Sequence, residues 1–141
     1  MIGSDYMREI LFRAKLKDDY FNKGWQYGFV HCTWFTGSIF KYWLTPIKKE
    51  NLTTSDTVCV NPETICEYTG LTDKNGTKIF EGDIVKTNQY QRSIGTDTFI
   101  IEFVEGNYYL CHDGCTLWTL RSFIEEVEVI GNKYDNLELI S

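Results

Sequence analysis

The stretch that decides the fold is YTGLTDKNGTKIFEGDIVK, residues 68–86 of the chain. Asparagine followed by glycine at 75–76 favours the positive φ angles of a type I′ turn, which joins two antiparallel strands. A second turn follows around the glycine at 81–83, and the β-branched pair at 84–85 then begins another strand. The stretch therefore predicts short strands linked by tight turns.

Alternation of apolar and polar side chains continues this pattern in both directions along the chain. Such alternation is typical of half-buried strands, and it occurs at residues 10–16, 25–30, 39–44, 98–104, 107–111 and 127–130. The Glu-Gly pair at 105–106 joins two of these strands as a hairpin. Many short strands at close spacing predict a mainly β fold, a small barrel or roll with an N-terminal β extension.

The buried face of these strands is expected to supply the hydrophobic core. In the strand at 84–86 we expect Ile84 to point inward, with Val85 and Lys86 pointing outward or lying at an edge. The other residues expected in the core are Phe103, Tyr109, Trp118 and Val129.

The composition indicates a compact protein with a substantial core. The chain has 141 residues and a mass of 16.5 kDa, and its aromatic content of 16% excludes bulk disorder. No segment approaches the roughly 18 apolar residues of a membrane helix, so no membrane association is expected. The first ten residues lack the apolar core of a signal peptide, and the five cysteines are an odd number. Both facts favour reduced thiols and a cytoplasmic location.

Residues 7–141 are expected to form a single domain. Residues 1–6 precede a second methionine, Met7, and are interpreted as a leader or as the product of an upstream start codon. The polar stretch at 45–56 is a candidate boundary, because Pro46 cannot donate a ladder hydrogen bond and polar residues follow it. It is interpreted either as a boundary between an aromatic N-terminal sheet and a C-terminal barrel, or as a long loop.

Three blocks of sequence resemble the YopX family of phage and prophage proteins. They are MREILFRA at 7–14, YTGLTDKNG with KIFEGDIVK at 68–86, and EVIGNKYDNLEL at 128–139. The blocks lie at the start, centre and end of the chain, so the resemblance spans most of it. It implies a mainly β fold with an SH3-like barrel in the C-terminal part, and a phage or prophage origin, hence a bacterial cytoplasm. It supplies no activity, so no catalytic residue is carried over.

The segment at 111–115, Cys-His-Asp-Gly-Cys, is the one cluster that suggests a metal or a nucleophile. Zinc needs four nitrogen or sulfur ligands, and Cys111, His112 and Cys115 are weak candidates because the tight Cys-x2-Cys spacing is missing. A catalytic Cys–His pair has a further defect, since neighbours in a strand point to opposite faces. The alternative is a strand end, a glycine turn and two half-buried thiols, which predicts no metal and no catalytic residue.

The aromatic residues of the N-terminal strands exceed what a small sheet can cover with its own layers. The residues expected at an interface are Trp25, Tyr27, Phe29, Trp34, Tyr42 and Trp43. Large apolar patches usually mark interfaces, so these residues predict a homo-oligomer or an unknown protein partner. The alternative is a weak single-stranded nucleic-acid-binding module that uses these aromatics with Lys41, Lys48 and Lys49. The net charge of −6 disfavours nucleic acid, because phosphate contacts depend on positive charge.

The sequence shows no assembled acid–base pair, activated nucleophile or phosphate-binding loop. We therefore expect a phage-derived, non-catalytic binding or interaction protein that uses no cofactor.

Overall fold

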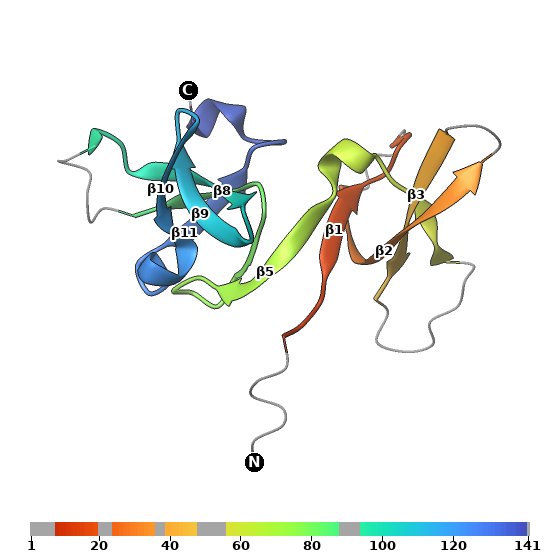
Figure 1. Ribbon diagram of the computed structural model, residues 1–141, viewed down its shortest axis with the longest axis horizontal. Helices are drawn as coiled ribbons and strands as arrows, with labels where there is room; N and C mark the ends of the chain where they lie inside the picture. Colours follow the sequence, from red (N-terminus) through yellow and green to blue (C-terminus); the bar gives the residue numbers. More distant parts are fainter. Residues whose placement is uncertain (1–7, 20–23, 36–38, 48–55, 88–93, 141) are drawn as a thin grey trace, which may run out of the picture. The chain divides into compact units, whose positions relative to one another are not determined.

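The computed structural model describes residues 8–19, 24–35, 39–47, 56–87 and 94–140 (Figure 1). It divides into two compact units, Met1–Glu67 and Tyr68–Ser141, which are named the N-terminal unit and the C-terminal unit. Both are built on antiparallel strands, with 3₁₀ turns among the described residues at Pro62–Thr64, Leu120–Phe123 and Leu137–Leu139. The fold is mainly β, as the alternation predicts.

The N-terminal unit is built on an antiparallel sheet of strand order β4-β3-β2-β1-β5-β6, of which β6 belongs to the C-terminal unit. The strands are β1 (Phe12–Lys15), β2 (Trp25–Phe35), β3 (Ile39–Pro46), β4 (Val58–Cys59), β5 (Cys66–Thr72) and β6 (Lys78–Phe80). β5 passes from one unit to the other, since Cys66 pairs with Arg13 of β1 and Tyr68 pairs with Phe80 of β6.

The two faces of the β1–β4 region differ because side chains alternate along each strand. On one face, Ala14, Leu44 and Val60 form a small buried core. The register pairs Arg13 with Tyr27 and continues in step into β3, so the odd-numbered residues of β1, β2 and β3 share the opposite face. This opposite face is named the outer face.

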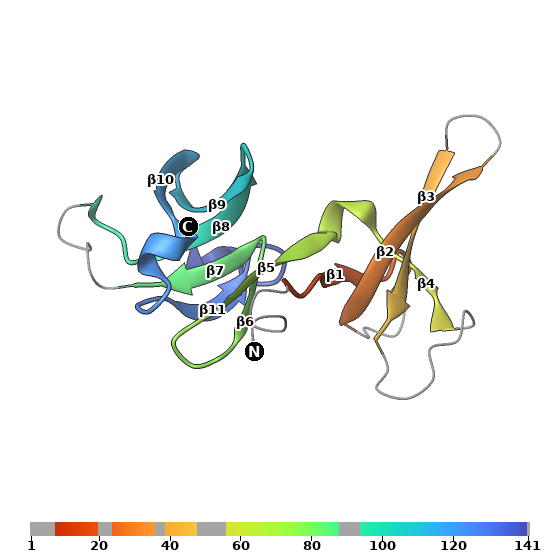
Figure 2. The same ribbon diagram turned by 60° about the horizontal axis from the view of Figure 1, so that its bottom comes forward.

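Gly28 lies where the backbones of β2 and β3 approach closely. A Cβ atom at this position would lie 2.0 Å from the carbonyl oxygen of Thr45, so this close approach of the two backbones requires glycine. β1 pairs with β2 over residues 25–28, and β4 pairs with β3 at Trp43 and Leu44. Beyond these points the β2–β3 hairpin is two-stranded among the described strands, and it continues as a long arm (Figure 2).

The C-terminal unit contains a second antiparallel sheet, of strand order β10-β9-β8-β7-β11. Its strands are β7 (Asp83–Lys86), β8 (Thr98–Val104), β9 (Asn107–His112), β10 (Cys115–Thr119) and β11 (Glu128–Asn132). Its core consists of Ile79, Val85, Phe99, Ile101, Leu110, Leu120, Phe123 and Val127. β10 and β11 stand at opposite edges, so the described strands form two antiparallel sheets and no closed barrel, and the barrel form of the predicted barrel or roll is not found.

The side chains of β7 correct a prediction from the sequence. Ile84 is fully buried as expected, but Val85 is fully buried as well and faces the core beside Phe99. β7 is an inner strand, paired with β8 on one side and β11 on the other. Ile84 and Val85 are consecutive and point to opposite faces, and both are fully buried, so both faces of β7 are covered and alternation no longer separates buried from exposed positions.

The predicted burial of Phe103 is wrong, because 51% of this residue is exposed. Phe103 lies near the end of β8, and its ring centroid is 5.2 Å from that of Tyr108. Trp118 and Val129 are half-buried and pack against the core, whereas Tyr109 is half-buried but is not part of it. The β8–β9 hairpin extends past the core, and alternation does not indicate where a core stops.

The division between the two units falls between Glu67 and Tyr68, inside β5. The predicted boundary at 45–56 begins at the end of β3, and its residues 48–55 lie outside the described residues, as does the predicted leader at 1–6. The single-domain interpretation and the internal boundary stay predictions.

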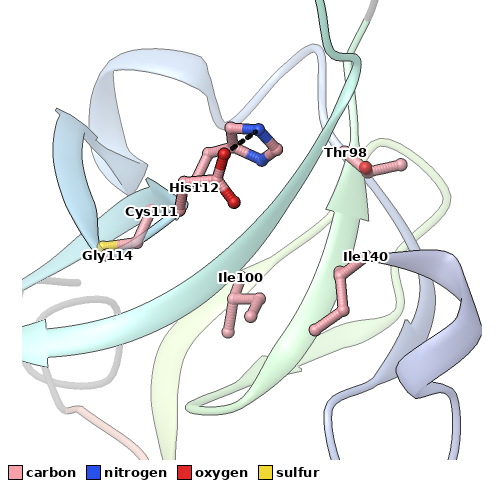
Figure 3. A pocket seen from close by; sticks show the side chains of 7 residues that line it. Thr98, Ile100, Cys111, His112, Gly114 and Ile140 are labelled. Atoms are coloured by element: carbon pink, nitrogen blue, oxygen red, sulfur yellow. Dashed lines mark ion pairs between the residues drawn. The ribbon is translucent and has the colours of Figure 1, made fainter.

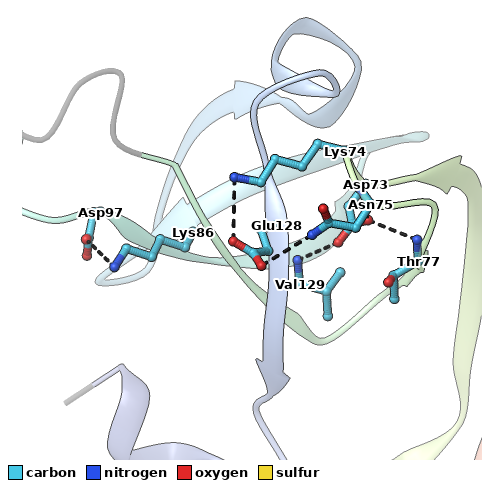
Figure 4. Close-up of polar contacts among 8 residues, drawn as sticks. All are labelled: Asp73, Lys74, Asn75, Thr77, Lys86, Asp97, Glu128 and Val129. Atoms are coloured by element: carbon cyan, nitrogen blue, oxygen red, sulfur yellow. Dashed lines mark hydrogen bonds and ion pairs between the residues drawn. The ribbon is translucent and has the colours of Figure 1, made fainter.

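The turn at 73–76 is closed by the buried carboxylate of Asp73 (Figure 4). Its Oδ1 accepts hydrogen bonds from the backbone N–H groups of Asn75 (2.8 Å) and Thr77 (2.9 Å), and its Oδ2 accepts one from Val129 of β11 (2.9 Å). Gly76 has a φ of 82°, whereas Asn75 does not have a positive φ, so the predicted type I′ turn is wrong. The aspartate side chain, and not the Asn-Gly pair, selects the turn geometry.

Two other turns have the consecutive positive φ angles of type I′. They are Glu105–Gly106, with φ of 48° and 88°, and Asp113–Gly114, with φ of 49° and 72°. The first joins β8 to β9, so the hairpin predicted at 105–106 is confirmed.

Ile84→Ala is expected to lower the free energy of unfolding by about 2–5 kcal/mol, because it leaves a cavity on a fully covered strand. Phe103→Ala is the matched control, expected to change stability by less than about 0.5 kcal/mol because the residue is exposed. Urea titrations of the full chain followed by far-UV circular dichroism measure both. Equal losses in the two variants would refute this placement.

Asp73→Ala is expected to cost about 2–4 kcal/mol of unfolding free energy, because three backbone N–H groups lose their acceptor at once. Asp18→Ala, at an exposed position in the N-terminal unit, serves as the control. The same urea titration applies, and a loss no larger than that of the control contradicts the anchoring role.

Candidate functional site

The cluster at 111–115 lies at the turn between β9 and β10. In the ladder, Cys115 pairs with His112 and Thr116 with Cys111, so the two thiols belong to opposite faces of the sheet. Cys111 is buried and Cys115 is exposed. Within the described part of the chain, no three His, Cys, Asp or Glu side chains gather as a metal-binding group. The register thus separates the two sulfurs that a zinc site would bring together.

A pocket of about 230 Å³ opens beside this turn (Figure 3). It is lined by Thr98, Ile100, Cys111, His112, Asp113, Gly114 and Ile140. His112 Nε2 lies 3.5 Å from Asp113 Oδ2. The Cys111 thiol instead donates toward the hydroxyl of Thr116 and the carbonyl of Tyr109, each 3.9 Å away. Cys111 and His112 both line the pocket, but their side chains point to opposite faces of β9, and the thiol is directed away from the imidazole (Figure 3).

The surroundings of Cys111 oppose a nucleophilic role. Burial raises the pKa of its thiol, the hydrogen bond with Thr116 acts in the opposite direction, and the charge of Glu102 raises the pKa again. A nucleophilic cysteine needs its thiolate form, which a nearby positive charge favours by lowering the pKa. The raised pKa keeps Cys111 a neutral thiol near neutral pH.

The outer face of the N-terminal unit carries two neighbouring exposed aromatic side chains. Tyr27 and Phe29 of β2 are 46% and 45% exposed. Trp43 of β3 is paired with His31, which places it diagonally across from Phe29. It is half-buried, and its indole Nε1 donates a hydrogen bond to Thr33 Oγ1 (2.8 Å). Rings from two strands thus lie together on one face.

Basic side chains contact the ring of Trp25, and one of them, Arg13, is itself only 5% exposed. The guanidinium carbon of Arg13 and the ammonium of Lys15 are 4.5 Å and 5.3 Å from the centroid of the Trp25 ring, within cation–π range. Lys17 and Lys41 line a pocket of about 130 Å³ at the β3–β4 edge. Its other described lining residues are Tyr42, Cys59, Val60 and Pro62, and none of the set is acidic.

Four of the six predicted interface residues lie on the outer face. Trp25, Tyr27 and Phe29 share the outer face with Trp43. Tyr42 does not, because it lies on the opposite face and packs against the small core of this unit. The side chain of Trp34 lies outside the described residues, as do Lys48 and Lys49.

Sequence reasoning missed the basic residues of the first strand as part of this face. Arg13, Lys15 and Lys17 alternate with apolar residues, which is the signal for a strand with one basic face. The alternation shows that one face of the first strand is basic. Which residues of β2 share that face follows only from the antiparallel register between β1 and β2.

Charge is divided unevenly between the two units. Residues 1–67 contain eight acidic and eight basic residues and are neutral overall. Residues 68–141 contain twelve acidic and six basic residues, so they account for the whole net charge of −6. The negative charge of the chain therefore does not apply to the unit that carries the outer face.

The family model described as YopX protein matches residues 11–141. The chain belongs to the YopX family. No curated protein matches it. A solved structure, protein EF1440 from Enterococcus faecalis, is similar with a TM-score of 0.58 and 20% identity, over 96% of this chain and 100% of that chain. At that identity the likeness concerns the fold, which for this YopX chain is mainly β.

Conspicuous polar residues of the YopX-like blocks have structural roles. Asp83 is buried, and its Oδ2 accepts a hydrogen bond from the backbone N–H of Phe80 (2.7 Å). Asn132 Oδ1 accepts from the N–H groups of Tyr134 and Asp135, each at 3.0 Å. β2 and β3 lie outside these three blocks but inside the family match, which covers residues 11–141. Among the described residues, no helix has the length and hydropathy of a membrane span.

Alkylation of the folded protein with iodoacetamide near pH 8 is expected to modify the exposed Cys32 and Cys115 first, and the buried Cys111 at least roughly tenfold more slowly. The physical reason is that Cys111 combines low exposure with a raised pKa. Peptide mass spectrometry at timed intervals measures the order. Preferential modification of Cys111 would reveal an activated thiol and would restore the nucleophile hypothesis.

Proposed function

We propose that this chain is a non-catalytic binding protein of a phage or prophage, active in the cytoplasm of the bacterial host, and that the outer face is its binding surface. The observation that carries the proposal is the adjacent exposure of Tyr27 and Phe29. Neighbouring aromatic rings on a sheet remove a large apolar area from water when a partner covers them. A partner that covers these rings explains why two large apolar side chains are exposed side by side.

Two features support a role without catalysis. The pocket beside β9 holds a thiol with a raised pKa and no described hydrogen bond to the neighbouring imidazole. The outer face, in turn, presents aromatic and basic groups, which suit binding more than acid–base chemistry. An SH3-like arrangement of the C-terminal unit and self-association into a homo-oligomer stay predictions within this proposal.

The double variant Tyr27→Ser/Phe29→Ser is expected to lower the affinity for whatever covers this face by at least about tenfold, because truncating interface aromatics commonly costs more than 1 kcal/mol each. The measurement compares material retained from a lysate of host cells, with sedimentation velocity reporting a second copy of the chain. Phe103→Ser, an equally exposed aromatic of the C-terminal unit, is the matched control. Identical retention and sedimentation for all three proteins would refute the proposed surface.

A further inference from the structure

The strand β2 has an open backbone edge beyond Gly28. β1 pairs with β2 only over residues 25–28, whereas β2 continues to Phe35. Among the described residues, 29–35 of β2 are therefore paired with β3 alone (Figure 2). The edge that faces away from β3 is a row of backbone donors and acceptors that a further strand can use.

The hydrogen-bond pattern shows which residues present these groups. Cys32 is paired with Tyr42 of β3. The carbonyl oxygen of Tyr42 accepts a hydrogen bond from the backbone N–H of Val60 (2.9 Å), on the side of β3 that faces away from β2. A residue of an antiparallel ladder directs both of its backbone polar groups to one side, and the side alternates along the strand. The N–H and C=O groups of Val30, Cys32 and Trp34 therefore point to the open edge.

This edge lacks the features that protect the other edges of the two described sheets. β4 and β6 are only two and three residues long, the pairing of β10 and of β11 contains a register shift, and β3 carries Lys41 beyond its pairing with β4. Short strands, irregular pairing and charged side chains keep sheet edges from adding strands. The stretch FVHCTWF, residues 29–35, contains no Asp, Glu, Lys, Arg, Pro or Gly, and it pairs with β3 without a register shift.

The composition of this stretch favours a second copy of the chain as the added strand. When two identical strands pair antiparallel about a two-fold axis, each residue lies opposite one from the same stretch, so a charged strand repels its own copy. Residues 29–35 bring no carboxylate, lysine or arginine to such a pair, and the N-terminal unit is neutral overall. A two-stranded ribbon is marginally stable by itself, and self-pairing joins two such arms into one larger sheet.

The extent of the open stretch fixes the register. The stretch begins after Gly28, the last residue paired with β1, and it ends with β2 at Phe35. Antiparallel pairing of the whole stretch with its copy places Cys32, the middle residue, opposite Cys32 of the second copy. Val30 then lies opposite Trp34, so all the outward backbone groups meet partners. Odd-numbered residues lie opposite odd-numbered ones, so the two outer faces become one continuous face.

We propose that the open edge of β2 pairs antiparallel with the same edge of a second copy, centred on Cys32, and makes the chain a two-fold dimer. This contact is a strand edge and not the aromatic face that the sequence predicts as the interface. The inference goes beyond the proposed binding role of the outer face and does not depend on it, because edge pairing uses the backbone. The dimer presents Tyr27 and Phe29 of both copies on one face.

Charges introduced at Cys32 test both the partner and the register. Cys32→Lys and Cys32→Asp each place like charges opposite each other, and each is expected to weaken dimerisation by roughly tenfold or more. An equimolar mixture of the two variants is expected to dimerise again, because the facing charges are then opposite in sign. Recovery in the mixture also shows that both variants are folded. Sedimentation velocity of the full chain over a concentration series measures the association constants.

Two control variants accompany these measurements. Cys32→Ser keeps the position uncharged, and Cys115→Lys adds a charge at the other exposed cysteine, in the C-terminal unit. Both are expected to dimerise as the parent does.

Crosslinking gives a second readout at the same residue. In the proposed register the two Cys32 α-carbons lie about 5.5 Å apart, the spacing of a hydrogen-bonded antiparallel pair. A short bismaleimide is therefore expected to join two chains through Cys32 in the parent and in Cys115→Ser, and not in Cys32→Ser. Edge pairing leaves side chains on the faces of the sheet, so both thiols stay open to the reagent. Peptide mass spectrometry identifies the linked residues.

A monomeric parent, a dimer indifferent to charge at Cys32, or a mixture that fails to restore the dimer would each overturn the proposal. If such a result accompanies a loss of retained protein in the Tyr27→Ser/Phe29→Ser variant, the outer face remains a binding surface and only the edge pairing is wrong. If retention is unaffected while the Cys32 variants behave as expected, the edge pairing stands and the outer-face proposal fails.

Discussion

The carboxylate of Asp73 is the contact on which the C-terminal unit depends. It accepts three backbone hydrogen bonds, two within the β5–β6 turn and one from Val129, which lies 56 residues further along the chain. A local turn and a long-range strand attachment are thereby made by one side chain. Because Val129 belongs to the edge strand β11, this contact fixes the end of the sheet whose inner strand β7 carries Ile84 and Val85. Burying a charge is tolerated there because backbone donors surround it.

The N-terminal unit is organised by a different constraint, the close approach of the paired strands β2 and β3 at Gly28. The core of this unit is small, with Ala14, Leu44 and Val60 at its centre. A core of that size cannot bury the aromatic residues of β2. Because side chains alternate along the strand, Tyr27 and Phe29 lie on the outer face. The exposure of these rings is thus a direct consequence of register and limited core volume.

The two units differ in chemistry as well as in packing. The C-terminal unit carries the net negative charge and the buried polar side chains that accept backbone hydrogen bonds. It also contains the pocket whose thiol is a poor nucleophile. The N-terminal unit is neutral overall and carries the outer face, on which Tyr27 and Phe29 are exposed.

Sequence alone determined the mainly β class, the hairpin at 105–106, the burial of Ile84 and the shared face of Trp25, Tyr27 and Phe29. These properties follow from turn chemistry and from period-two alternation, which are local. Only the tertiary structure decided that Val85 is buried and Phe103 exposed, since burial depends on what packs against each face of the sheet. It also decided that Asp73 selects its turn, that Cys111 and Cys115 lie on opposite faces, and that Lys17 and Lys41 line one pocket. These features depend on the geometry of side chains and on strand register, and register is set by the packing of whole strands rather than by neighbours in sequence.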